Sequence, residues 1–317
     1  GTLENARGSR EHPARGVTVD SLTHALAAVL VFSGHLQGMG LLAAVLGSVL
    51  PDCDILFHTL SGRDPRLFLF THGGFTHSFP GTLVTAAGVA TGFAAWACAT
   101  GQNPSLFGIT GIVFFSALGG ALTHVILDFL ALPGIPLLYP RTERKVSLKI
   151  FPGPSILLLV ISVSFIFLFL LGLAKSQVLH IYAVFFVGVI LARAGLRVIA
   201  VHRFGRGALP TFNPMKWLVI EDTGDTSRVY YSHLFSSPEG ERIYPKNSRY
   251  PPENPADYIR DPEIRRLIYN SYVVVAEKQE GGTLLRDPLR EDGYFFYPTE
   301  HTRILIRDKA ETGGVTP

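Results

Sequence analysis

The 317-residue chain is poor in charge and in cysteine. Acidic and basic side chains make up 17% of it, whereas a soluble domain usually carries about 25%, so an ordinary cytosolic protein is not expected. Two cysteines exclude a disulfide framework and a cysteine-rich zinc finger. A net charge of +3 gives no support to nucleic-acid binding. Apolar residues are plentiful, at 47%, which excludes a disordered or collagen-like chain.

The few charges are unevenly distributed. Residues 21–51 carry none, residues 78–140 carry only Asp128, and residues 152–192 carry only Lys175. More than half of the charged residues lie in the C-terminal third of the chain. We therefore predict three regions, namely a disordered arm or cloning remnant at 1–18, a membrane domain at 19–202 and a polar domain at 203–317.

About six apolar segments, the first two short, predict an α-helical polytopic membrane domain. A spanning helix needs about 20 mostly apolar residues. The stretch 21–50 is interrupted at 33–38 and predicts two short helices or a re-entrant hairpin. Basic loop residues fall almost entirely on one side, which predicts a multi-pass protein of the inner or plasma membrane with both termini in the cytoplasm. The four longer segments are 78–100, 105–132, 154–174 and 177–201.

The C-terminal domain is predicted to be small, mainly β and cytoplasmic. Runs rich in Val, Ile and Tyr alternate there with turn signals, as in antiparallel sheets. The stretch 236–262 is rich in Pro, Glu and Tyr and predicts a long surface loop. The predicted strands are 216–220, 228–235, 267–277 and 302–307.

Histidine and aspartate account for most ionisable residues at the ends of the membrane segments. Such residues are costly in a membrane and are usually functional. His124 and Asp128 lie four apart and share a helix face. Imidazole and carboxylate groups together bind zinc, manganese or iron(II), and several carboxylates can hold two ions. All clusters fall on one predicted membrane face, which predicts a metal site with the ligands His24, Asp52, Asp54, His72, His77, His124 and Asp128.

Each of these residues also has a simpler explanation. Asp52 could cap the helix that follows it. Asp128 could pair with Arg141, and residues 73–74 could form only a turn. These explanations treat the shared face of the clusters as a coincidence. Cys53 is interpreted as a packed thiol.

Four motifs together resemble a known family. They are Leu22-Thr23-His24, Gly47-Ser48-Val49-Leu50-Pro51-Asp52-Cys53-Asp54, His72-Gly73-Gly74-Phe75-Thr76-His77-Ser78 and His124-Val125-Ile126-Leu127-Asp128. Over about 19–200 the chain resembles the YdjM-like membrane-bound metal-dependent hydrolases, and its His and Asp pattern is also similar to that of zinc-dependent phospholipases C. The family's loop usually reads His-Arg-Gly-x-Thr-His-Ser, whereas Gly73 stands at the arginine position here. If that arginine holds an anionic substrate, another residue must replace it, for which the candidates are Arg63, Arg66 and Arg141.

The resemblance implies a metal-dependent hydrolase. One or two divalent ions, zinc first and manganese or iron as alternatives, would activate water against a phosphoester or lipid-linked substrate at the cytoplasmic face. Asp54 or Asp52 would take the proton of that water, and Asp20 would orient His24. Two alternatives remain open, a metal-ion transporter with the same ligands and a non-catalytic membrane anchor that presents the C-terminal domain. The expected partners are the bilayer and its lipids, and no nucleic acid.

Overall fold

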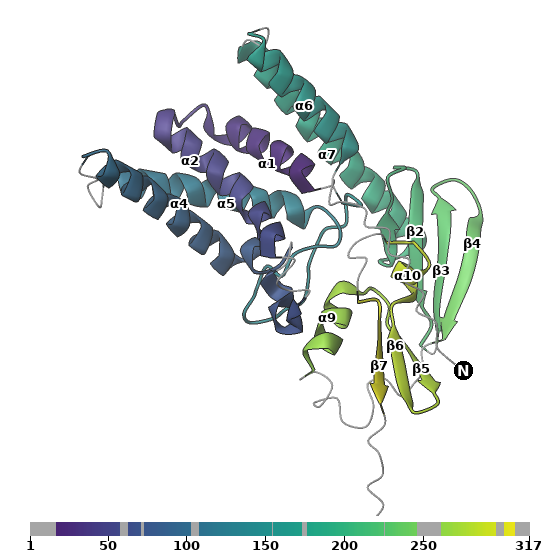
Figure 1. Ribbon diagram of the computed structural model, residues 1–317. Helices are drawn as coiled ribbons and strands as arrows, with labels where there is room; N and C mark the ends of the chain where they lie inside the picture. The colour runs from purple at the N-terminus through teal and green to yellow at the C-terminus, as the bar shows by residue number, and fades with distance from the viewer. Residues whose placement is uncertain are drawn as a thin grey trace, which may run out of the picture.

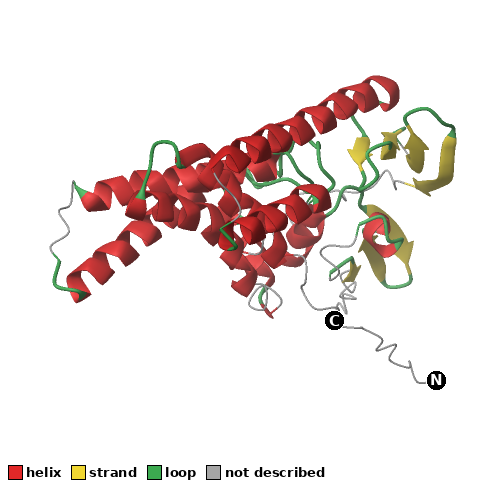
Figure 2. Cartoon of the chain, turned by 90° about the horizontal axis from the view of Figure 1, so that it is seen from above, coloured by secondary structure: helices red, strands yellow, loops and turns green. Residues whose placement is uncertain are grey.

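A helical N-terminal part and a C-terminal part with two small sheets make up the structure (Figures 1 and 2). The predicted arm at 1–18 lies outside the described residues except for Val17 and Thr18, which begin the first helix. This computed structural model describes residues 17–57, 63–70, 73–102, 108–153, 155–172, 176–224, 226–245, 261–295 and 301–307.

In the described residues of the N-terminal part there are six apolar helices, and three short 3₁₀ helices lie between the second of them and the next. The apolar helices are α1 (Val17–Phe32), α2 (Gly38–Val49), α4 (Phe79–Ala99), α5 (Ile109–Phe129), α6 (Ile156–Leu170) and α7 (Ser176–Phe204). The 3₁₀ helices are η1 (Leu50–Phe57), η2 (Pro65–Phe70) and η3 (Phe75–His77).

Four helical stretches of the described chain are long and apolar enough to cross a membrane. The second predicted segment is not short, because α2 continues directly into η1. Conversely, α6 has 15 residues, fewer than the roughly 20 that a span needs, although 154–174 was predicted to cross. The four stretches are Gly38–Phe57, Phe79–Ala99, Thr110–Phe129 and Val178–Phe204.

Small residues allow helices α2 and α5 to touch through their backbones. A Cβ atom at Gly120 would lie 1.8 Å from the carbonyl oxygen of Ala44, so only glycine fits there. Contacts of this kind are typical of membrane helices, where van der Waals packing drives association. As a result, Ser48 near the end of α2 lies next to His124 of α5.

The C-terminal part contains two antiparallel sheets, with strand orders β1-β2-β3-β4 and β5-β6-β7. This confirms the prediction of a small, mainly antiparallel β domain. The strands are β1 (Ala208–Pro210), β2 (Lys216–Asp222), β3 (Thr226–His233), β4 (Pro238–Pro245), β5 (Val275–Gln279), β6 (Gly282–Arg286) and β7 (Arg303–Arg307). Among the described residues of this part, two short helices accompany them, α9 (Pro262–Asn270) and α10 (Pro288–Glu291).

Two predictions for this part need correction. The stretch 267–277 was predicted as a strand, but only its end, from Val275, lies in a strand, β5. Its start lies inside α9, because Asp261 accepts hydrogen bonds from two backbone amides of the first turn and Pro262 follows it. The stretch 236–262, predicted as a loop, contains strand β4, which pairs with β3. The remainder of that stretch, 246–260, lies outside the described residues.

The two parts share a hydrophobic core. Leu132, in the segment that follows α5, is buried together with Leu209 and Leu218 of the C-terminal part. Helix α9 lies beside the end of the helical part (Figure 1). The C-terminal part is therefore in direct contact with the loops at one end of the membrane helices.

Candidate metal centre

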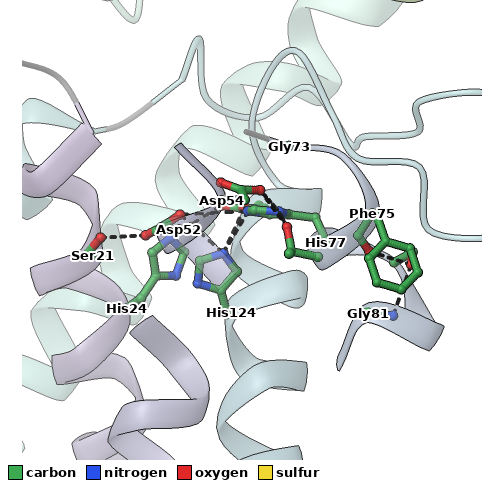
Figure 3. A network of polar contacts seen from close by, with 12 residues as sticks. Ser21, His24, Asp52, Asp54, Gly73, Phe75, His77, Gly81 and His124 are labelled. Atoms are coloured by element: carbon green, nitrogen blue, oxygen red, sulfur yellow. Dashed lines mark hydrogen bonds and ion pairs between the residues drawn. The ribbon is translucent and has the colours of Figure 1, made fainter. Parts of the chain in front are cut away.

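Buried polar side chains gather at one end of the helical part. Figure 3 shows them pointing toward one another from different elements. Asp128 lies one helical turn beyond His124 and faces the same place. Five of these residues are almost fully inaccessible, namely His24 on α1, Asp52 and Asp54 on η1, His77 on η3 and His124 on α5.

Two carboxylates converge on the Nε2 atoms of His77 and His124. The Nε2 atoms of His77 and His124 are 3.0 Å apart. Oδ2 of Asp128 lies 3.0 Å from Nε2 of His77 and 3.2 Å from Nε2 of His124. Oδ1 of Asp52 lies 3.7 Å and 3.6 Å from the same two nitrogens. Both carboxylates thus approach the same pair of imidazole nitrogens, which mark the point of convergence of these side chains.

Three of these residues could together hold a metal ion, because one ligand atom each of Asp52, His77 and His124 lies within 4.8 Å of the others. Two imidazoles with two carboxylates also form a donor set that suits zinc, manganese or iron(II). Both the geometry and the chemistry of these residues fit a divalent metal ion.

His24 extends the donor set beyond these four residues. Its Nε2 atom lies 3.3 Å from Oδ1 of Asp128, whereas His77 faces Oδ2 of that carboxylate. The His24 ring stacks on the ring of His124, with the centroids 3.9 Å apart. His24, His124 and Asp128 form a second group that could hold an ion. Both groups contain His124, whose Nδ1 atom is bonded to the Ser48 carbonyl, so its Nε2 atom can bind an ion in only one of the two groups at a time.

Neighbouring groups hold the outer nitrogens of two imidazoles. Nδ1 of His124 donates to the carbonyl oxygen of Ser48 at 2.7 Å, because a carbonyl can only accept. Nδ1 of His77 lies 2.9 Å from Oγ1 of Thr76 and 3.4 Å from Oδ2 of Asp54. Both contacts leave Nε2 directed at the point of convergence. Metal-binding histidines are usually oriented in this way.

Asp52 and Asp54 have different surroundings. Asp52 accepts a hydrogen bond from Ser21 at 2.6 Å through Oδ2, so that Oδ1 faces the imidazoles. Asp54, predicted as a ligand and as a proton acceptor, has its Oδ2 at the outer nitrogen of His77, where it also accepts a hydrogen bond from Thr76. The contacts of Asp54 are therefore those of a group that orients His77.

Three contacting groups were not identified from the sequence: the hydroxyls of Ser21 and Thr76 and the carbonyl of Ser48. Ser21 precedes His24 by three residues and so lies on the same helix face, which is a signal that could have identified it. Thr76 is adjacent to His77. The carbonyl of Ser48 carries no signal in the sequence, because its role depends on how α2 packs on α5.

The centre has an excess of negative charge. Burial by itself lowers the pKa of the His77 imidazole, but hydrogen bonds to Asp128, Asp52 and Asp54 raise that pKa well above its usual value. Several buried carboxylates around one imidazole need a compensating cation. A proton on His77 or a divalent metal ion would each supply that charge.

The remaining predicted site residues have other locations. His72 and the side chain of Asp20 lie outside the described residues. Cys53 is exposed, so its interpretation as a packed thiol was wrong. Asp128 faces histidines, and no ion pair joins it to an arginine within the described chain. The predicted anion-binding residues Arg63, Arg66 and Arg141 are exposed and, in the described chain, make no hydrogen bond or ion pair with the centre.

A bundle of apolar helices with a buried His and Asp centre at one end defines a polytopic membrane protein with a candidate metal site. The chain belongs to the YdjM inner membrane protein family, whose model matches residues 19–201. The match includes every candidate ligand and confirms the family resemblance seen in the motifs. No curated protein and no solved structure matches the chain.

Proposed function

We propose that this membrane protein is a metal-dependent hydrolase that cleaves a phosphoester or a lipid-linked substrate at the cytoplasmic membrane surface. The observation that carries the proposal is the convergence of two carboxylates on the Nε2 atoms of His77 and His124, in an arrangement that could hold a divalent ion. The location of this centre at one end of apolar helices favours a substrate that is itself in the membrane.

His77, His124, Asp52 and Asp128 would hold the ion, zinc by preference. When bound, the ion supplies Lewis acidity, which activates water and polarises a substrate oxygen. Ser48 and Asp54 keep the two imidazoles in a ligating orientation. The role of Asp54 or Asp52 as the proton acceptor stays a prediction.

A strained lysine in the segment bonded to the end of α5 favours an anionic substrate. Lys149 has a φ of 56°, which is uncommon for a residue other than glycine. Its two neighbours donate backbone hydrogen bonds to the carbonyls of Phe129 and Leu130, the residues that follow Asp128. Strained backbone of this kind often marks a functional position.

Further cations accompany Lys149. Burial and the charges of Arg197 and Arg144 lower the pKa of Lys149. Within the described chain, none of these three side chains has a carboxylate partner, so their repulsion is uncompensated by the protein. A phosphate group on the substrate would provide the missing negative charge.

A metal-ion transporter is the main rival. It would use the same residues for transient binding, but it needs polar ligands along a path through the membrane. The described ligands lie at one end of the helices, which favours a surface reaction over transport.

The test uses the full-length protein purified in detergent. Metal content is measured by mass spectrometry, and hydrolysis is measured with phosphoesters and with phospholipid vesicles. Asp52→Asn removes a candidate ligand. Asp64→Asn is the matched control, because within the described chain the side chain of Asp64 accepts a hydrogen bond only from its own loop, at the amide of Arg66. Wild type and the control should contain metal and cleave a substrate, whereas Asp52→Asn should do neither.

Wild-type protein without stoichiometric metal would contradict the proposal. If metal is present but no ester is cleaved, and metal ions cross liposome membranes that contain the protein, transport is the function.

A further inference from the structure

Helix α9 of the C-terminal part lies against the loops that carry the metal centre. Arg265 forms an ion pair with Glu143, in the segment between α5 and α6. The same guanidinium stacks over the ring of Phe68 in η2, 5.5 Å from its centroid. Both contacts reach from the C-terminal part into the helical part.

Tyr269, on the same helix, reaches that loop directly. Its hydroxyl donates a hydrogen bond of 3.1 Å to the carbonyl oxygen of Gly73. Gly73 has a φ of 74°, a left-handed conformation that favours glycine. The turn continues through Gly74, whose carbonyl accepts from the amide of His77 at 3.1 Å. The C-terminal part therefore forms a direct hydrogen bond with the turn that presents the candidate ligand His77.

Packing fixes the ring of Tyr269. The ring meets that of Phe68 edge to face, with centroids 5.1 Å apart. Nζ of Lys145 lies 4.0 Å from the centroid of the Tyr269 ring and donates to Oδ1 of Asn270 at 3.2 Å. Burial, with the charges of Glu143 and Asp54, raises the pKa of Tyr269. The hydroxyl therefore remains protonated and able to donate.

We infer that Tyr269 is a positioning residue for the metal centre, and that the C-terminal part holds the ligand turn in place. Through the carbonyl of Gly73 it fixes the start of the turn from which Thr76 and His77 project toward Asp54 and the point of convergence. This inference rests on the proposed function in so far as the centre binds a metal ion. It gives the C-terminal part a role in shaping the site.

The test replaces a single hydroxyl in the full-length protein. Tyr269→Phe keeps the ring, and hence the packing on Phe68 and Lys145, but removes the hydrogen bond to Gly73. Tyr272→Phe is the matched control, because the buried hydroxyl of Tyr272 has no hydrogen-bond partner within the described chain. Two properties are measured, the affinity for zinc by competition with a chelator and amide hydrogen exchange of the peptide that contains residues 73–78.

Loss of a group that orients a metal ligand usually lowers metal affinity by about 10-fold to 100-fold. Tyr269 contacts the turn and not the ligand His77 itself, so in Tyr269→Phe we expect the affinity for zinc to fall by about 3-fold to 10-fold. Exchange in residues 73–78 should rise in Tyr269→Phe, and Tyr272→Phe should match wild type in both measurements. With cobalt(II) in place of zinc, the visible absorption of Tyr269→Phe should also change, which a loss of general stability would not produce.

Equal affinity, spectrum and exchange in the two variants would overturn the inference. Faster exchange of residues 73–78 with an unchanged affinity for zinc would also overturn it. In that case Tyr269 would hold the turn, but the turn would not affect metal binding. A wild type that binds no metal would refute the proposed function, and exchange would still decide whether Tyr269 fixes the turn.

Discussion

The contact between α2 and α5 predicts a severe effect of one added methyl group. In Gly120→Ala the new Cβ atom would lie 1.8 Å from the carbonyl oxygen of Ala44 and 3.0 Å from the amide nitrogen of Ser48. Ordinary contact of such atoms requires about 3.5 Å, so the helices must move apart by about 1.5 Å. The hydrogen bond from His124 to Ser48, now 2.7 Å, would lengthen to about 4 Å and be lost.

The energetic and functional consequences follow from this displacement. Overpacking costs about 1–3 kcal/mol, and the lost hydrogen bond costs about 1 kcal/mol more. Without its carbonyl acceptor the imidazole of His124 is no longer held in a ligating orientation, which should weaken metal binding by about 10-fold to 100-fold.

Gly111→Ala is the matched control, because it lies on the same helix and a Cβ atom there would have no neighbour within 4 Å. That variant should be as stable as wild type or more stable by up to about 1 kcal/mol, since alanine favours helix. Thermal unfolding in detergent and chelator competition measure the two effects. A Gly120→Ala protein that binds metal as tightly as Gly111→Ala would refute the reasoning.

Three further predictions concern the centre, the docking of α9 and the topology. Asp128→Asn should reduce bound metal to roughly a tenth or less of wild type by mass spectrometry, because that carboxylate faces three imidazoles. Burial and the charge of Arg290 lower the pKa of Lys145 to about 7. When α9 is undocked, Lys145 has the pKa of a free lysine, about 10.4. Between about pH 7 and about pH 10 the undocked form therefore binds more protons than the docked form, so docking of α9 should strengthen as the pH rises through this range. The strength of docking is measured by amide hydrogen exchange of α9, corrected for the intrinsic pH dependence of exchange. In Lys145→Met the docking of α9 should no longer depend on pH in this range. Cys53 and Cys98 are both exposed. Cys53 lies at the end of the helices that carries the centre, and Cys98 lies at the opposite end. A membrane-impermeant maleimide should therefore label only Cys98 in right-side-out vesicles and only Cys53 in inside-out vesicles. The reverse pattern would place the centre outside the cell.

The sequence contained enough information to predict that the histidines and aspartates would gather. Apolar length and loop charge are one-dimensional properties, and together they assign each helix end to a side of the membrane. His24, His77 and His124 come from distant segments and still meet, as predicted. The break at 33–38, which contains serine, histidine, glutamine and two glycines, likewise predicted two helical halves, either as two short helices or as a re-entrant hairpin.

The detailed arrangement of the centre could not be predicted in the same way. Asp52 and Asp54 are equivalent by spacing, and only the 3₁₀ path of η1 places one toward the Nε2 atoms and the other at the outer nitrogen of His77. The contact from Tyr269 to Gly73 joins residues 196 positions apart. No local pattern encodes such a contact, because it depends on how the helical part and the C-terminal part pack together.

The contacts that hold the candidate ligands in position are all made within the protein, and they determine how the centre would bind metal. The backbone approach at Gly120 fixes His124, and Tyr269 fixes the turn before His77. Neither contact requires an ion, in contrast to small zinc domains that fold only when metal binds. The carboxylates around His77 favour a proton there when metal is absent. Metal binding to this centre should therefore release a proton into solution while leaving the fold unchanged, and its affinity should fall as the pH is lowered.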